Sequence, residues 1–253
     1  MKEGDKNSKF FHKMTNARRR KNFLSSITVD GRKLTEETEI KEGVVNAFHN
    51  ILSKKGEWRP SISGLSFSSL DSVQARLLED VFSMEEVQDV VFGLNGDKAP
   101  GPDGFTLAFW QFCWDIVKHE VMGFFAEFHS SSRFERSLNS TFIVLIPKKG
   151  GTDDLKDFRP ISLVGSLYKI LVKVLANRLK RVVGNVISNS QYAFVEGRQI
   201  LNAVLIANEA LDLRLKSAKG GIICKVDIEK VYDHVNLGLL LAILDKMGFE
   251  TKG

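Results

Sequence analysis

A carboxylate near the end of the chain stands where phosphoryl-transfer chemistry would need a metal ligand. In the run KVDIEKVYD (225–233), strand alternation puts Lys225 and Asp227 on one face, with Asp227 where helix signals begin. Two-metal phosphoryl transfer needs carboxylates at such rigid edges to bind Mg²⁺ beside a substrate phosphate. The same pattern also fits an aspartate that caps a helix beside a salt-bridged neighbour.

Cationic residues flank a polar turn in the middle of the chain. Lys148 follows an apolar run that predicts a strand over residues 141–147, and Arg159 lies in an extended segment after the turn. A hairpin built from these segments would carry both cations. Such a pair can hold a triphosphate, with the guanidinium binding bidentately. Turn charges that are simply exposed to solvent give the same pattern.

Basic residues gather in two segments, while the formal net charge of the whole chain is +5. Residues 1–21 contain eight lysines and arginines against two acidic residues, and residues 148–181 contain nine against three. Separated basic segments fit a polyanionic partner such as a nucleic acid, but they also fit solvated helix faces.

Composition excludes several classes of protein and of site. No apolar run reaches the ~18–20 residues of a membrane span, and the first ten residues lack the apolar core of a secretory signal. We therefore expect a nuclear or cytoplasmic location, with no membrane partner. Cys113 and Cys224 lie far apart without a Cys/His cluster, and Cys224 is expected to be a buried thiol. No P-loop or nucleophile-elbow pattern occurs.

Periodicity and turn signals predict the elements that position these residues. Asp30-Gly31 predicts a hairpin turn, and Ser83 with Glu86 predicts a capped helix start. The spacing predicts helices over residues 84–94, 106–129, 166–183, 199–216 and 229–246, and strands over residues 141–147 and 222–227.

This order of helices and strands predicts an α+β fold without regular βαβ repetition. The Ser-, Gly- and Pro-rich residues 55–71 are expected to be a loop or linker. They would separate a helical linker segment, residues 1–54, from a main domain, residues 72–253.

Five segments together carry a resemblance that none carries alone. In chain order they are KAPGPDG (98–104), TFIVLIPKKG (141–150), DFRPISLVGSLYKILVKVLANRLK (157–180), QYAFVEGRQI (191–200) and KVDIEKVYDHVN (225–236). The series resembles the reverse transcriptase domain of non-LTR retrotransposons, especially the plant LINE-like type. It covers nearly the whole chain. The resemblance implies the fingers and partial palm of a right-hand polymerase, preceded by a small helical and hairpin segment.

The resemblance also implies an activity and a set of site residues. The activity is RNA-directed DNA synthesis with Mg²⁺, an RNA template, a DNA primer and deoxynucleoside triphosphates. Asp227 would be the first metal-binding carboxylate, and the carbonyl of Ile228 a second ligand. Tyr232 would exclude a ribose 2′-OH, with Val231 beside it in the nucleotide pocket.

Further roles follow from the other matched segments. Lys148 and Arg159 would hold the incoming triphosphate. The residues implied near the template or the nucleotide pocket are Gly101, Pro102, Asp103, Gly104, Gln191, Gly197 and Arg198. No protein partner is deducible from the sequence.

The sequence departs from the family pattern at three places. Val231 stands where the family has a small residue, and Leu237 where it usually has tryptophan. The Tyr/Phe-Ala-Asp-Asp segment, which supplies further carboxylates, does not occur before Gly253. We therefore expect a truncated polymerase that is inactive by itself. The alternatives are a non-catalytic nucleic-acid-binding remnant of that domain, or a product of gene prediction without a cellular role.

Overall fold

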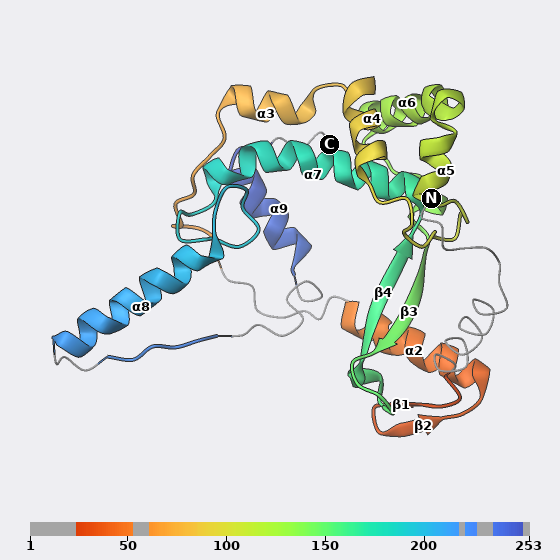
Figure 1. Ribbon diagram of the computed structural model, residues 1–253, viewed down its shortest axis with the longest axis horizontal. Coiled ribbons are helices and arrows are strands. Elements are labelled where there is room, and N and C mark those ends of the chain that lie inside the picture. Colours follow the sequence, from red (N-terminus) through yellow and green to blue (C-terminus); the bar gives the residue numbers. More distant parts are fainter. Residues whose placement is uncertain (1–23, 53–60, 218–220, 227–234, 250–253) are drawn as a thin grey trace, which may run out of the picture. The chain divides into compact units, whose positions relative to one another are not determined.

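The computed structural model describes residues 24–52, 61–217, 221–226 and 235–249. Contacts divide the chain into two compact units (Figure 1). Unit 1 comprises residues 1–56 and 143–162, and unit 2 comprises residues 57–142 and 163–253. Helices predominate and the sheets have two strands each, so the described chain has the α+β character expected from the sequence.

The described part of unit 1 contains a short hairpin near residue 30. Strands β1 (Ile27–Val29) and β2 (Arg32–Leu34) pair in antiparallel register, with Ile27 opposite Leu34. Asp30 and Gly31 both have positive φ, 49° and 83°, as a two-residue type I′ turn requires. The predicted hairpin turn is therefore confirmed. Helix α2 (Glu37–Leu52) follows it.

A second hairpin from the middle of the chain supplies residues 143–162 of unit 1. Strand β3 (Thr141–Pro147) pairs with β4 (Phe158–Val164), and the short 3₁₀ helix η2 (Leu155–Asp157) precedes β4. Phe158 is buried with Ile27 and Leu34 in one apolar cluster. The backbone N–H of Thr28 also donates to the carbonyl of Asp153, at 2.6 Å. Segments more than a hundred residues apart thus share one small core.

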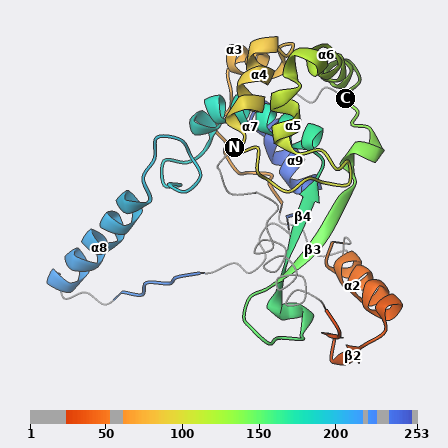
Figure 2. The ribbon, with the colours of Figure 1, turned by 45° about the vertical axis from the view of Figure 1, so that its right-hand side comes forward.

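Unit 2 is helical. Within its described residues the helices are α3 (Ser72–Glu79), α4 (Met84–Gly93), α5 (Leu107–Phe112), α6 (Trp114–Ser131), η1 (Arg136–Asn139), α7 (Ser166–Val186), α8 (Ile200–Lys216) and α9 (Leu237–Lys246). Helices α4, α5 and α6 pack around one another, and α4 packs on α7 (Figure 2). The core they share contains Val87, Phe125, Ile170 and Val174, all fully buried. No helix within the described ranges is long and apolar enough to cross a bilayer.

The helix predicted over residues 106–129 is two helices. Cys113 separates α5 from α6, with φ −92° and ψ 9°, outside the usual helical range. The change of direction accompanies burial of Trp114, whose indole Nε1 donates to Gln88 Oε1 of α4 at 3.1 Å. Periodicity alone missed this break because the apolar spacing continues through Cys113.

The strand predicted over residues 222–227 is not found in its described part. Residues 221–226 lie in no strand, Ile222 is 97% exposed and Cys224 is exposed. The predictions of a buried strand and a buried thiol were wrong there. An apolar run forms a strand only where another segment offers backbone donors and acceptors, and the described residues place none beside it.

The last helix begins later than predicted. Helix α9 starts at Leu237, and the Asn236 side chain caps it by accepting from the Leu239 N–H at 3.0 Å. Of the predicted helix over 229–246, residues 229–234 lie outside the described ranges.

Candidate functional site

The two cations predicted to hold a phosphate group lie on one hairpin of unit 1. The backbone N–H of Lys148, just after β3, donates to the carbonyl of Asp157 at 2.8 Å. Arg159 lies two residues further on, as the second residue of β4. Both side chains are exposed. The Lys148 ammonium donates to the carbonyl of Lys156 at 2.7 Å, so one of its three donors is already used.

Two neighbouring charges on this hairpin are paired with each other. Lys149 Nζ lies 2.8 Å from Asp157 Oδ2, which also accepts from the Thr152 hydroxyl at 2.8 Å. The hydrogen bond from Lys149, and then that from Thr152, lower the pKa of Asp157, and Asp157 in turn raises the pKa of Lys149. Arg159 has no ion-pair partner within the described ranges. Its guanidinium is therefore the group on this hairpin best able to meet an anion.

The GPDG segment lies against the start of α7 in unit 2. A Cβ added to Gly101 would lie 2.4 Å from the carbonyl carbon of Val164, which is closer than real Cβ atoms come. Gly104 has φ +72°, a conformation that favours glycine. Both glycines are thus needed for local geometry, while Pro102 and Gly104 themselves are exposed.

Asp103 supplies the cap that α7 lacks in its own sequence. The N-cap residue of α7 is Gly165, which has no side chain. Asp103 Oδ2 accepts instead from the Ser166 N–H at 2.9 Å, and the Ser166 hydroxyl donates to the carbonyl of Phe105 at 2.6 Å. Lys169 also donates to the carbonyl of Ala99, at 2.8 Å. Three hydrogen bonds and a close backbone contact therefore fix the GPDG loop to α7.

Arg198 binds the opposite end of α7. Its guanidinium donates to the carbonyls of Gly184 and Ile187, at 3.0 and 3.2 Å, and also to those of Ser188 and Gln191. The Gln191 side chain donates to the carbonyl of Ala193 at 3.0 Å. Gly197, beside Arg198, has φ +77°. These contacts satisfy carbonyls that the end of a helix leaves unpaired.

The structure does not bring the two predicted template groups together. Asp103 lies at one end of α7 and Arg198 at the other, and a helix of 21 residues is about 30 Å long. Asp227, Ile228, Val231 and Tyr232 lie outside the described ranges. Among the residues that the structure does describe, no three His, Cys, Asp or Glu side chains gather as metal ligands.

One buried ion pair was missed by the sequence reasoning. Arg178 is 6% exposed and binds Glu86 bidentately, at 2.9 and 2.7 Å. Its other donors go to the carbonyls of Leu78, Asp80 and Val81, and it lies over the Phe82 ring at 4.2 Å. Arg178 therefore does not offer its charge to a partner, although it lies in the basic segment 148–181. The available signal was its position four residues after Val174 and four before Val182, on the buried face of the helix.

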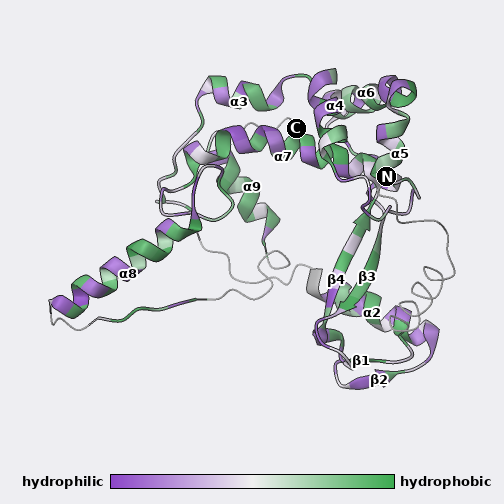
Figure 3. Ribbon diagram, viewed as in Figure 1, coloured by the Kyte–Doolittle hydropathy of each residue, from purple (hydrophilic) through white to green (hydrophobic). Residues whose placement is uncertain are grey.

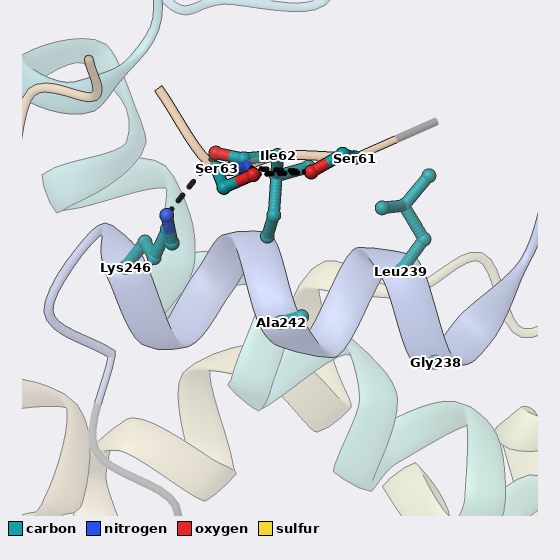
Figure 4. A pocket seen from close by; sticks show the side chains of 7 residues that line it. All are labelled: Ser61, Ile62, Ser63, Gly238, Leu239, Ala242 and Lys246. Atoms are coloured by element: carbon teal, nitrogen blue, oxygen red, sulfur yellow. Dashed lines mark hydrogen bonds between the residues drawn. The ribbon is translucent and has the colours of Figure 1, made fainter. Parts of the chain in front are cut away.

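A pocket of about 430 Å³ lies between α9 and the segment that precedes α3 (Figure 4). It is lined by Ser61, Ile62, Ser63, Gly238, Leu239, Ala242 and Lys246. Lys246 spans it by donating to the carbonyl of Ile62 at 3.1 Å. None of the predicted site residues lines this pocket, which marks where the segment packs on α9.

Comparison with known proteins identifies related sequences. Residues 146–252 match the family described as reverse transcriptase (RNA-dependent DNA polymerase). The chain is 27% identical over 249 residues to the "Transposon TX1 uncharacterized 149 kDa protein" of Xenopus laevis, covering 97% of this chain and 19% of that protein. It is 26% identical over 235 residues to the Pol polyprotein from the type-1 retrotransposable element R1 of Bradysia coprophila, covering 92% and 22%.

A third relative is the RNA-directed DNA polymerase from the mobile element jockey of Drosophila funebris. It is 27% identical over 169 residues, which cover 64% of this chain and 18% of that protein. The chain thus spans about a fifth of the length of the curated relatives that it matches.

Proposed function

We propose that this chain, which carries reverse transcriptase sequence of the non-LTR retrotransposon kind, supplies the nucleotide- and template-binding part of an RNA-directed DNA polymerase. The observation that carries the proposal is the match over residues 146–252, which begins on the hairpin that presents Lys148 and Arg159. The substrates would be an RNA template, a DNA primer and deoxynucleoside triphosphates. We further propose that the chain belongs to a plant LINE-like element and acts in the nucleus or cytoplasm.

Different residues of this chain would bind the triphosphate and select the sugar. Arg159 would bind the triphosphate as a fork, because its guanidinium is exposed and lacks an ion-pair partner within the described ranges. Lys148 would join it once its ammonium turns from the Lys156 carbonyl toward the stronger charge. Tyr232, with Val231 beside it, would close the pocket against a ribose 2′-OH.

Asp227 and the carbonyl of Ile228 would hold Mg²⁺ in this proposal. Carboxylate and carbonyl oxygens are ligands that Mg²⁺ accepts, so the donor types fit the ion. When bound, the metal would neutralise charge on the phosphates. A single carboxylate does not fix two metals in a defined geometry, so we expect the 253-residue chain to lack polymerase activity by itself.

The loops at the two ends of α7 would lie along the template. Gly101 and Asp103 would fix the loop to α7, and its exposed residues Pro102 and Gly104 would face the nucleic acid. Arg198 would act as a positioning residue. Its four carbonyl contacts fix the turn that contains Gly197. The same contacts position Gln191, which is exposed.

The test grafts residues 1–253 into an active non-LTR polymerase in place of the matching segment. We expect Asp227→Ala to abolish primer extension on RNA. We expect Arg159→Ala to raise the KM for deoxynucleoside triphosphates about tenfold or more, since a charge-assisted bidentate contact would be lost. Lys156→Ala, an exposed cation near the same hairpin, should change the KM less than twofold. An unchanged KM in Arg159→Ala would refute the triphosphate role.

The isolated chain separates this proposal from its alternative, a non-catalytic nucleic-acid-binding remnant. Both predict binding to single-stranded RNA that weakens about fiftyfold between 50 and 200 mM salt, for roughly four phosphate contacts. Only the remnant predicts that the grafted polymerase stays inactive while RNA binding persists. Primer extension by the isolated chain, lost in Asp227→Ala, would show that it is active alone.

A further inference from the structure

Two exposed phenylalanines form a stacked pair just after the GPDG loop. The ring centroids of Phe105 and Phe109 are 4.6 Å apart and their planes are tilted by 34°. The two residues are 44% and 36% exposed. Trp110 supports the pair with its ring nearly perpendicular to both, at 6.1 and 5.7 Å. The tilted pair therefore leaves ring surface open to water, where a planar ligand could meet it.

Hydrogen bonds fix the backbone that carries this pair. The Phe105 N–H donates to Asp103 Oδ1 at 3.3 Å, and its carbonyl accepts from the Ser166 hydroxyl at 2.6 Å. The Phe109 N–H donates to Thr106 Oγ1 at 3.4 Å. The backbone that carries the pair is thus fixed before any ligand arrives, which reduces the ordering cost of binding.

We propose that Phe105 and Phe109 form a stacking platform for an unpaired base of a single-stranded nucleic acid. This site rests on the proposed function, which brings a single-stranded template to the chain. Every base has a π face, so aromatic platforms bind single strands with little sequence preference.

Charge beside the pair favours a nucleic acid over an apolar protein segment. Lys98 is exposed in the same loop, and the Lys169 ammonium lies on that loop at the carbonyl of Ala99. Asp103 is exposed as well, and its carboxylate oxygens accept from the backbone N–H groups of Phe105 and Ser166. Asp97 is a second exposed acidic residue of the loop. In this proposal the two lysines of the adjoining loop would meet phosphates of the bound strand, as cations do in single-strand binding grooves.

The experiment measures RNA binding by the 253-residue chain and its variants. The probe is a single-stranded oligonucleotide that contains 5-iodouridine, which crosslinks to a stacked ring under light. We expect the double variant Phe105→Leu/Phe109→Leu to bind about tenfold more weakly, because one stacked base is lost. Phe109→Tyr should bind within twofold of the parent chain. Phe112→Leu is the control, because Phe112 is 92% exposed but stacks on no ring within the described ranges.

The crosslink identifies the contact directly. Mass spectrometry should place it at Phe105 or Phe109. Undiminished RNA binding in the double leucine variant, with crosslinks elsewhere, would overturn the platform and leave the proposed function standing. Absence of salt-dependent RNA binding in the parent chain and in every variant would overturn both the platform and the proposed function.

A protein-docking role has a different signature. A face that docks an apolar protein segment tolerates leucine and is weakened by the tyrosine hydroxyl. RNA binding that is kept in the leucine variant and lost in Phe109→Tyr would therefore also overturn the platform. Thermal unfolding midpoints equal to the parent's confirm that each variant is folded.

Discussion

Arg178 and Arg159 differ in burial, and this difference determines whether the guanidinium stabilises the fold or is available to a ligand. Arg178 is enclosed by Glu86, three carbonyls and the Phe82 ring, so its charge is neutralised and hydrogen-bonded inside the molecule. Arg159 is exposed and lacks an ion-pair partner within the described ranges. Counting basic residues along the sequence treats the two alike. Only the packing of α7 separates the structural cation from the one that can meet a ligand.

Removing Arg178 should destabilise the fold strongly. We expect Arg178→Met to lower the free energy of unfolding by about 3–5 kcal/mol, because Glu86 and three carbonyls lose their partner in a buried site. Lys180→Met, an exposed change on the same helix, should cost less than about 0.5 kcal/mol. Urea denaturation of the two variants gives the comparison. Equal losses in both would contradict the structural role of Arg178.

The Lys149–Asp157 pair should be insensitive to pH over a wide range. The pKa of Asp157 is lowered, so the pair is intact above the ordinary aspartate pKa of about 3.9 and is lost as the pH falls through the folded-state value. The pKa of Lys149 is raised, so the pair persists above pH ~10.4 and is lost as the pH rises through the folded-state value.

Carboxyl-carbon NMR shifts of Asp157 check this expectation. We expect Lys149→Met to raise the pKa of Asp157 toward its ordinary value, because the main stabilising hydrogen bond is removed. Lys33→Met is the matched control, since Lys33 pairs with Asp153 instead, at 3.7 Å. An Asp157 titration that does not change in Lys149→Met would show that the pair does not form in solution.

At the scale of elements, helix α7 organises unit 2. The GPDG loop fixes its first turn, and Arg198 binds its last carbonyls. Arg178 links its middle to α4 and to the segment before α4. Segments that the sequence suggested for template contact therefore also determine where this helix lies. A change in either motif can affect activity through α7 without touching the nucleic acid.

The contact of Gly101 with α7 gives a test with a matched control. A methyl group at Gly101 would meet the Val164–Gly165 backbone, which cannot rotate away as a side chain would. We expect Gly101→Ala to destabilise the chain by about 1–3 kcal/mol. Gly93→Ala, in α4 with open space around the new methyl, should be neutral or stabilising by up to about 1 kcal/mol. Chemical denaturation measures both, and matching effects would refute the close contact.

Local signals predicted elements well and their partners poorly. The periodicity of residues 166–183 gave α7, and Ser83 caps α4 as expected, accepting from the Glu86 N–H at 3.1 Å. The Glu86 side chain, however, turns to Arg178 instead of completing a capping box. That partner lies 92 residues further along the chain, beyond the reach of any local pattern.

In the candidate site, too, features within one local segment were predicted, while contacts between distant residues were not. Lys148 and Arg159 were predicted together because one hairpin joins them. The partner of Asp103 was not predicted, since Ser166 lies 63 residues away. Helix α3 was also missed, although Asp71 and Gln74 form a capping box at its start. That signal is local, but aspartate stands at the first position, where the capping-box pattern usually has serine or threonine.

At the scale of the whole molecule, α8 contains apolar residues along its length (Figure 3). The described residues leave the side chains of many of them exposed. Leu205 is 56% and Leu213 62% exposed, and no residue of the helix is buried. A helix that is apolar on several sides usually packs against other protein. The leucines of α8 are exposed, so they do not contribute to the buried core of unit 2.

Charged substitutions should show this difference. We expect Leu205→Glu and Leu213→Glu to change the free energy of unfolding by less than about 0.5 kcal/mol and to raise solubility. Val174→Glu should prevent stable folding, because it buries a charge in the core beside Ile170. Circular dichroism and urea titration compare the three variants. Unfolding caused by Leu213→Glu would mean that α8 is packed in solution.

The sharing of one core by residues 27–34 and 153–158 has a consequence for the order of synthesis. The backbone of Thr28 pairs with that of Asp153, so β1 leaves the ribosome well before its partner exists. At about 5–20 residues per second, the interval is roughly 6–25 s. During that time Ile27 and Leu34 have no Phe158 to cover them. A nascent chain paused between these two segments would be the form that chaperones bind most readily.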